Sequence, residues 1–209
     1  MKNLVFAFAS ALIIFVIFAA YQLSKFFSIS SGSKISQYQN QKTALLVMDM
    51  QIEFADSARK ILETVNKTID YFSAKNEAIV YIKTQYDKSD YLLNFIRKNA
   101  ALEGGSGVNF LPELKTASHN IFVKNRMDAF SNRELDDFLV KNQIGHIFVA
   151  GLDGCYCLDK TIRAAIRRGY KVTLITDAAV SKKDAEFGAV KENLNRQGVE
   201  LITSAGLIK

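Results

Sequence analysis

Three side chains that could cooperate in nucleophilic catalysis each follow a short apolar run of the sequence. Asp49 ends the run TALLVMD, Lys124 ends NIFVK, and Cys157 ends GLDGCYC, which follows HIFVA. A thiol can act as a nucleophile, a carboxylate can accept its proton, and an ammonium can stabilise the resulting negative charge. Each residue alone is more often a turn residue, a solvated lysine or a small core residue. Their shared placement at the ends of three apolar runs points to one site.

The position of Cys157 predicts a reactive thiol. It stands where a helix is expected to begin, and free N–H groups at a helix start lower a cysteine pKa. A nearby Lys124 would lower the pKa of Cys157 further. His119 and His146, the only histidines, precede apolar runs and would lie at the opposite edge of a sheet, which disfavours a Cys-His pair. Asp49 is therefore the candidate base.

The elements that must position these residues can be read from the apolar pattern. Six continuous apolar runs have the length of buried strands: 43–49, 78–84, 120–124, 146–151, 171–177 and 199–203. Continuous rather than alternating runs are typical of a parallel sheet covered on both faces. Ligands bind beyond the carboxyl ends of such strands, which is where the acid, the lysine and the thiol are expected.

Helical patterns separate these runs. The expected helices begin after Ser57, at Ser131, near Leu158 and at Ser181. Ser131 and Glu134 form an S-x-x-E capping box, and Arg167 with Arg168 suit the negative end of the third helix. Residues 101–118 form an irregular excursion that we expect over the site. The fold class is α/β: a doubly wound, mainly parallel sheet of about six strands with helices on both faces.

Three segments resemble motifs of the isochorismatase-like cysteine hydrolases, the family of nicotinamidase-related amidases. LLVMDMQIEF is similar to their D-x-Q-x-x-F opening, and VKNRMDAF to their K-x-x-x-[SD]-A-F segment. VAGLDGCYCLDKTIRAAIRRGYKVTLITDAA is similar to their cysteine region. The resemblance covers most of residues 43–209 in the right order and spacing.

The resemblance implies a role for each residue. Cys157 would attack the carbonyl carbon of an amide or ureido-type C–N bond and form a thioester. Asp49 would take its proton and pass it to the leaving amine, while Lys124 would orient Asp49. The backbone N–H groups of Asp153 and Cys157 would form the oxyanion hole. A cis peptide bond is implied at Leu152–Asp153.

The sequence says less about the substrate pocket and about a metal or cofactor. We expect Phe54, Gln85 and Phe130 to line the substrate pocket, although ordinary core positions are equally compatible with the two phenylalanines. Nicotinamidases of this family carry metal-binding histidines after the second strand, and the matching stretch TQYDKSDY has none. The resemblance therefore implies no metal and no cofactor. Asp153 is unusual in an oxyanion loop, and Cys155 is interpreted as a packing residue.

The N-terminal region lies outside the resemblance. Residues 4–21 form an uncharged apolar run close to the roughly 20 residues that span a bilayer. We interpret residues 1–27 as a single membrane-anchoring helix, with cleavage as an export signal as the alternative. The flanking charges leave its orientation open. Residues 28–42 are rich in Ser and Gln and are predicted to form a flexible tether before a domain at 43–209.

Composition limits the partners. The net charge is +6, but the basic residues are scattered among acids, so no nucleic-acid partner is expected. The expected partners are a small amide-like substrate and the membrane, and relatives of this fold suggest a homo-oligomer. Two alternatives stay open: a membrane-tethered binding or scaffold protein of the same fold, and a redox-sensing protein using Cys155 and Cys157.

Overall fold

A single sheet of six parallel strands forms the centre of the computed structural model, which describes residues 2–36 and 41–208. The strands are β1 (Lys42–Met48), β2 (Ala78–Thr84), β3 (Ile121–Lys124), β4 (Ile144–Gly151), β5 (Lys171–Ala179) and β6 (Glu200–Ile202). Their order across the sheet is β3-β2-β1-β4-β5-β6. The first strand, β1, lies inside the sheet, and later strands are added on both sides of it. This order confirms the doubly wound fold.

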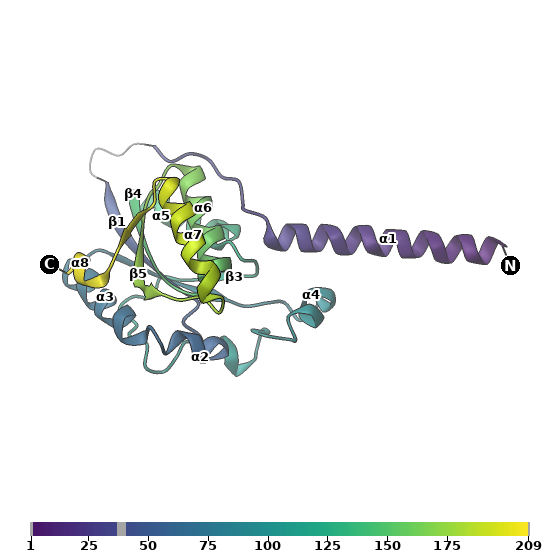
Figure 1. Ribbon diagram of the computed structural model, residues 1–209, viewed down its shortest axis with the longest axis horizontal. Coiled ribbons are helices and arrows are strands. Elements are labelled where there is room, and N and C mark those ends of the chain that lie inside the picture. The colour runs from purple at the N-terminus through teal and green to yellow at the C-terminus, as the bar shows by residue number, and fades with distance from the viewer. Residues whose placement is uncertain (1, 37–40, 209) are drawn as a thin grey trace.

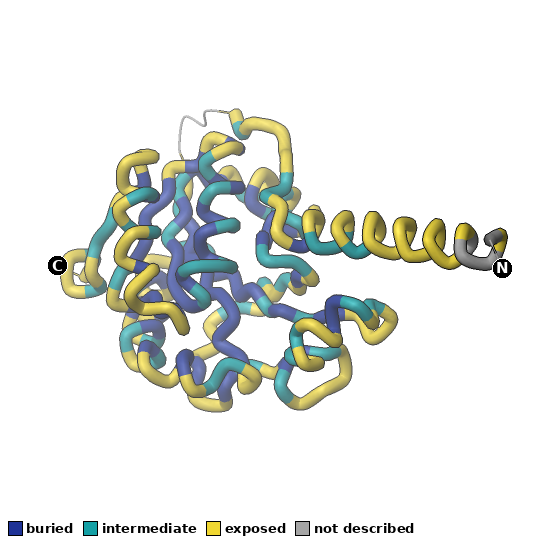
Figure 2. The backbone as a smooth tube through the Cα atoms, turned by 45° about the vertical axis from the view of Figure 1, so that its right-hand side comes forward, coloured by how far each residue is buried: buried dark blue, intermediate teal, exposed yellow. Residues whose placement is uncertain are grey.

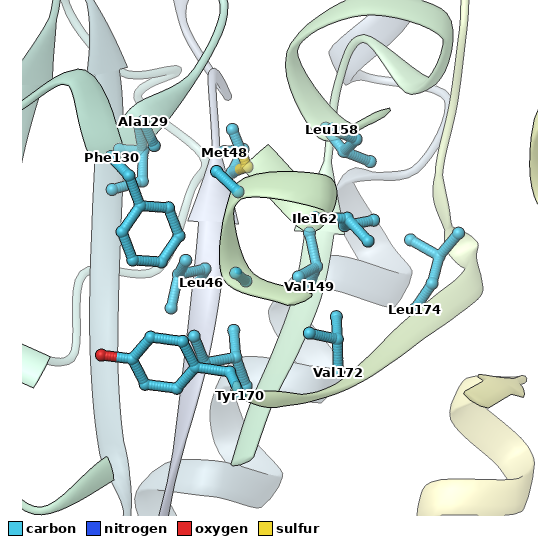
Figure 3. Packing of buried hydrophobic residues seen from close by; sticks show 14 of the residues in the cluster. Leu46, Met48, Ala129, Phe130, Val149, Leu158, Ile162, Tyr170, Val172 and Leu174 are labelled. Atoms are coloured by element: carbon cyan, nitrogen blue, oxygen red, sulfur yellow. The ribbon is translucent and has the colours of Figure 1, made fainter. Parts of the chain in front are cut away.

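The two faces of the sheet are covered by different helices. Side chains alternate between faces along a strand, so Leu46 and Met48 of β1 pack in one buried cluster while Leu45 and Val47 pack in the other. The first cluster is covered by α5 (Arg133–Lys141), α6 (Asp159–Arg168) and α7 (Asp184–Arg196), and Figure 3 shows part of it. The second is covered by α3 (Leu62–Ala74). Both faces are therefore buried, as the continuous apolar runs require (Figure 2).

The remaining elements are short. They are α2 (Ala55–Ala58), α4 (Tyr91–Ile96), α8 (Ser204–Leu207), and single turns at Ile52–Phe54, Ser106–Val108 and Ala129–Ser131. The capping box predicted for α5 has the wrong N-cap residue. Asn132, not Ser131, accepts the hydrogen bond from the backbone N–H of Glu134, because Ser131 still belongs to the preceding turn and donates to Asp128.

One helix, α1 (Lys2–Phe27), projects from the domain as a rod (Figure 1). Its residues Phe8–Phe27 have a mean hydropathy of 1.8, and 6% of that window is buried. The helix is long and apolar enough to span a membrane or to act as a signal sequence. Its last turn differs from the rest, since the Phe26 ring is buried against Tyr86, 5.8 Å between ring centroids.

The segment after α1, predicted to belong to a flexible tether, contacts the domain in its described part. Ile29 and Ile35 pack against the domain core, and the backbone N–H of Ser30 donates to Asp128. The N–H of Ile35 donates to the carbonyl of Arg168. Residues up to 36 are thus docked on the domain, because their few apolar side chains and backbone groups find partners there. Residues 37–40 lie outside the described residues.

Arg168 is the anchor for this docked segment, rather than a solvated helix-terminal cation. Its side chain is 1% exposed and its Nε lies 2.9 Å and 3.0 Å from the two carboxylate oxygens of Asp136. Its other nitrogens donate to Ser30, Ser31 and Ala164. All three guanidinium nitrogens are therefore satisfied.

Arg168→Met is expected to destabilise the protein by about 3 kcal/mol, because it leaves carbonyl and carboxylate oxygens without their buried partner. The measurement is thermal or denaturant unfolding of the full chain in detergent micelles. Arg167→Met is the matched control, since Arg167 is exposed at the neighbouring position. Equal stability of the two variants would contradict the anchoring role.

Candidate active site

Asp49, Lys124 and Cys157 lie in contact at the carboxyl edge of the sheet. The Nζ atom of Lys124 is 2.9 Å from Oδ2 of Asp49 and 3.2 Å from Sγ of Cys157. The side chain of Lys124 is fully buried and that of Asp49 is 2% exposed. Asp49 follows β1, Lys124 ends β3, and Cys157 lies in the π-helical turn Gly154–Leu158 that leads into α6. Three distant segments thus deliver an acid, an ammonium and a thiol to one point.

Thr84 is a fourth member of this cluster that the sequence interpretation missed. Its hydroxyl accepts a hydrogen bond from Lys124 Nζ at 2.6 Å and donates one to Asp49 Oδ1 at 2.8 Å. Thr84 ends β2, which lies between β1 and β3, and it pairs in register with Lys124. A threonine closing the strand between those of the acid and the lysine was the available signal.

Gln51, the glutamine of the D-x-Q motif, connects the strand ends. Its side-chain amide is fully buried and donates to the carbonyls of Thr84 and Val108 at 2.8 Å and 2.9 Å. Its Oε1 accepts the backbone N–H of Thr84 at 2.7 Å. The two hydrogen bonds between the Gln51 side chain and the Thr84 backbone extend the β1–β2 pairing by one residue position, and they hold the Thr84 hydroxyl between Asp49 and Lys124.

Backbone conformation at the end of β1 also places the acid. Asp49 has φ = 57°, a left-handed conformation that is unusual without glycine and recurs at functional sites. Beside it, Gly151 at the end of β4 has φ = 118°, and a Cβ there would lie 2.1 Å from the Met48 carbonyl. Only glycine fits this close approach, so β4 can pass β1 and carry the cysteine loop to Asp49.

A cavity of about 390 Å³ opens above these groups. Its wall is mainly apolar and aromatic, with a few charged groups. The lining residues include Asp49 and Cys157 with Phe26, Phe27, Phe54, Tyr86, Ile96, Arg97, Ala100, Met127, Leu152, Asp153, Tyr156 and Lys182. The thiol is therefore accessible to a small molecule and is not sealed in apolar packing.

Comparison with known proteins decides the family. The model of the isochorismatase domain matches residues 43–206. The chain belongs to the isochorismatase family. It is 25% identical to nicotinamidase 3 of Arabidopsis thaliana over 177 residues, which cover 78% of this chain and 89% of that protein.

Solved structures of this family have the same fold. N-carbamoylsarcosine amidase of Thermoplasma acidophilum superposes with a TM-score of 0.70 and 25% identity, over 78% of this chain and 97% of that one. A cysteine hydrolase of Pseudomonas syringae pv. phaseolicola superposes with a TM-score of 0.73 and 20% identity, over 86% and 97%. This chain therefore shares its fold with almost the whole length of both solved chains.

Of the three residues expected to line the substrate pocket, the structure places only Phe54 there. Gln85 lines a neighbouring surface depression instead, because side chains alternate at the end of β2 and Tyr86 faces the cavity. Phe130 is 2% exposed and points into the core, 5.8 Å from the ring of Tyr170 (Figure 3). Both positions are corrected: Tyr86 and Met127 occupy the wall that Gln85 and Phe130 were expected to form.

The cysteine loop explains the unusual Asp153. Its Oδ1 accepts hydrogen bonds from the N–H of Cys155 and the hydroxyl of Ser181, and its Oδ2 accepts the N–H of Lys182. The carboxylate thus ties this loop to the segment before α7. The Leu152–Asp153 peptide bond is cis, as this family implies. Cys155 packs beside the core cluster, with its sulfur 3.6 Å from the Lys183 carbonyl, consistent with a packing role.

Burial dominates the electrostatics of the resting site. It raises the pKa of the Cys157 thiol to about 12, even though Lys124 acts in the opposite direction. The expected lowering is therefore wrong, because desolvation and the Asp49 charge outweigh the ammonium. Burial alone would lower the pKa of Lys124, but the neighbouring Asp49 carboxylate raises it above its ordinary value. The resting pair is thus a neutral thiol beside an ammonium.

The described residues do not fit a nicotinamidase-type metal site. No group of three or more His, Cys, Asp or Glu side chains within 2–36 and 41–208 is placed to hold a metal ion. In the stretch after β2, the Asp87 carboxylate is engaged by the N–H and hydroxyl of Ser89.

Thr84→Val is expected to lower kcat for a hydrolysis carried out at this site by about tenfold or more, because the hydrogen bonds of the bridging hydroxyl to Lys124 and Asp49 are lost. Thr84→Ser keeps the hydroxyl and is expected to retain most of the activity. Steady-state ammonia release by the two variants is the measurement. A valine variant with unchanged kcat would show that the bridge does not organise the site.

Proposed function

We propose that this protein is a cysteine hydrolase that cleaves a C–N bond of a small amide or ureido-type molecule. The observation that carries the proposal is the buried ammonium of Lys124, within 2.9 Å of Asp49 Oδ2 and 3.2 Å of Cys157 Sγ at the wall of a cavity. A thiol, a base and a fixed cation in one accessible site are the groups that acyl transfer requires.

The proposed reaction has two halves. Cys157 Sγ attacks the carbonyl carbon while its proton passes to Asp49, and the oxyanion is stabilised by the backbone N–H groups of Asp153 and Cys157. Asp49 then protonates the leaving nitrogen, the C–N bond breaks, and ammonia or an amine departs from a Cys157 thioester. Water, deprotonated by Asp49, then attacks the thioester carbon, the C–S bond breaks, and a carboxylic or carbamic acid is released. The proton passes from Asp49 to the Cys157 sulfur, which restores the thiol and the base.

Asp49 is essential to this scheme because the resting thiol is neutral. With a pKa of about 12, Cys157 is almost wholly protonated at neutral pH, so attack needs a base in contact. Lys124 keeps the carboxylate oriented and compensates the charge that forms on sulfur. Thr84 and Gln51 hold Lys124 and Asp49 in place and act as positioning residues.

We further propose that α1 is retained as a membrane anchor. Phe26 and Phe27 at its domain end line the same cavity as Cys157, so cleavage of α1 as an export signal would remove part of the cavity wall. The 20-residue window from Phe8 to Phe27 is long and apolar enough to cross a bilayer. Extraction of the full chain by detergent but not by alkaline carbonate, with Lys2 still present by mass spectrometry, is the expected result.

The activity can be tested with the full chain in detergent micelles. Primary amides and ureido compounds that fit a cavity of about 390 Å³ are incubated with the protein, and ammonia is measured by a coupled assay. At least one compound is expected to be turned over, and acid quenching should trap its acyl group on Cys157, visible by peptide mass spectrometry.

Failure of this test has a defined meaning. If iodoacetamide reaches Cys157 but no compound yields ammonia or an acylated Cys157 peptide, the enzyme proposal is wrong. The chain is then a binding or scaffold protein of the same family. A redox-sensing role predicts instead a Cys155–Cys157 modification after mild peroxide treatment, which the same mass spectrometry detects.

A further inference from the structure

Arg97 brings a buried cation to the wall of the cavity. It follows α4 directly, lines the cavity that Cys157 and Asp49 also line, and has a side chain that is only 11% exposed. Its guanidinium carbon lies 3.6 Å from the ring centroid of Tyr86 and 5.1 Å from that of Phe26. The aromatic faces fix the plane of the guanidinium, which is the arrangement in which arginine recognises planar anions.

The hydrogen-bonding capacity of Arg97 is mostly unused. Its Nη2 donates to Asn94 Oδ1 at 2.6 Å and forms an ion pair with Asp90 Oδ2 at 3.7 Å. Its Nε and Nη1 are buried and donate to no atom of the described residues. Buried donors left unsatisfied cost free energy, so such groups usually have a partner.

Arg168 shows what a purely structural buried arginine looks like in this chain. All three of its guanidinium nitrogens donate to protein oxygens, among them both oxygens of Asp136. Arg97 differs because its Nε and Nη1 have no acceptor among the described residues, and because the residue lines the cavity. The stacking on Tyr86 and Phe26 orients Arg97 but does not satisfy these N–H groups.

The other charges of the cavity are compatible with an anionic ligand. The carboxylate of Asp49 is paired with Lys124, and that of Asp153 accepts hydrogen bonds from Ser181 and Lys182. The side chain of Lys182 adds a second cation to the lining. The remaining lining residues are mostly apolar, and a low-polarity wall strengthens the attraction between Arg97 and an anion.

We propose that Arg97 is a specificity-determining residue that binds an anionic group of the substrate, most simply a carboxylate, while Cys157 attacks an amide elsewhere in the same molecule. The substrate class is thus a small amide or ureido compound that carries a carboxylate, with an apolar body that fits the aromatic wall. This proposal rests on the proposed hydrolase function for its reaction but not for its binding step.

Binding is tested first, without turnover, in the full chain carrying Cys157→Ala. The probes are 3- and 4-carbamoylbenzoate, compared by calorimetry with 3- and 4-nitrobenzamide, which have the same shape and no charge. At least one carboxylate is expected to bind about tenfold or more tightly than its nitro counterpart, because a charge-assisted pair with a buried arginine forms. Raised salt concentration should lower the affinity for the carboxylate compounds more than that for the nitro compounds. Equal affinities for carboxylate and nitro compounds would overturn the proposal.

Variants then assign the preference to Arg97. In the same Cys157→Ala background, Arg97→Gln is expected to reduce the carboxylate preference to about twofold or less and to leave nitrobenzamide binding unchanged. Lys98→Gln is the matched control, because it removes one positive charge at the adjacent, exposed position that does not line the cavity. A preference that survives Arg97→Gln, or falls equally in Lys98→Gln, contradicts the assignment.

Turnover separates this proposal from the hydrolase proposal. With Cys157 intact, Arg97→Gln should raise KM for the carbamoylbenzoate by about tenfold or more and change kcat little, since the group binds away from the reacting carbon. Arg97→Gln that lowers kcat for charged and neutral amides alike would mark a merely structural residue. A protein that binds carboxylates through Arg97 but releases no ammonia would overturn the hydrolase proposal and leave the anion site standing.

Discussion

Cys157→Ala is expected to abolish amide hydrolysis, lowering kcat/KM by at least about 10⁴-fold, because removal of a nucleophile leaves only the residual effect of the oxyanion hole and binding. The small side chain keeps the cavity open, so substrate affinity should be retained. Ammonia release and substrate binding, measured on the same preparation in detergent micelles, distinguish lost chemistry from lost binding.

Cys155→Ala is the matched control for this loss. The two thiols are two residues apart, but only Cys157 lines the cavity, while the sulfur of Cys155 lies near the Lys183 carbonyl. Its variant should keep nearly full activity. An active Cys157→Ala protein, or equal loss in both variants, would show that Cys157 is not the nucleophile.

Asp49→Asn is expected to have two effects of opposite sign. Turnover should fall by about a thousandfold, because the base that takes the thiol proton is lost. The thiol itself should become easier to ionise. The negative charge of Asp49 raises the pKa of Cys157, and the ammonium of Lys124 lowers it. Of these two charges only the ammonium remains in Asp49→Asn, so the pKa of Cys157 should fall.

The second effect can be measured by alkylation against pH. In the wild type, thiolate forms only as pH approaches the raised pKa of about 12, so iodoacetamide labelling of Cys157 should still increase at pH 10. In Asp49→Asn the curve should shift to lower pH, and labelling at pH 8 should accelerate by about tenfold for each unit of pKa lost. Cys155, whose labelling is followed separately by mass spectrometry, is the internal control. Its labelling curve should be the same in the wild type and in Asp49→Asn. Slower labelling of Cys157 in the variant would mean that the carboxylate does not raise its pKa.

The same pKa value has a consequence for stability. A thiol that titrates near 12 when folded and near its ordinary value when unfolded favours the folded state while it is protonated. This contribution is present below the unfolded pKa and is lost as pH rises through the range between the two values. Alkaline conditions should therefore weaken the wild type more than Cys157→Ala.

Local patterns in the sequence were enough to predict the sheet and the convergence of three side chains. Continuous apolar runs indicate parallel strands buried on both faces, and residues that end such strands share one edge. Asp49 and Lys124 each terminate a run, so strand direction predicts that they lie at the same edge of the sheet. The strand order, with only β2 between β1 and β3, brings them into contact. The motif around Cys157 predicted the family, and the match of the isochorismatase domain over residues 43–206 confirms it.

Tertiary structure alone decided what surrounds these three residues. The sequence assigned Gln85 and Phe130 to the pocket, whereas alternation at the end of β2 turns Tyr86 inward and packing draws Phe130 into the core. Spacing likewise could not show that Arg168 binds the segment after α1. Nor could it show that Arg97, far from Cys157 in the chain, faces the same cavity.

The physical reason is the range of the interactions involved. Strand formation and side-chain alternation depend on neighbours a few residues away, which the sequence displays directly. Burial, and with it the pKa of Cys157 and the unsatisfied donors of Arg97, depends on which distant segments exclude water from a group. That exclusion exists only once α1, the stretch around α4 and the cysteine loop have packed around the end of the sheet.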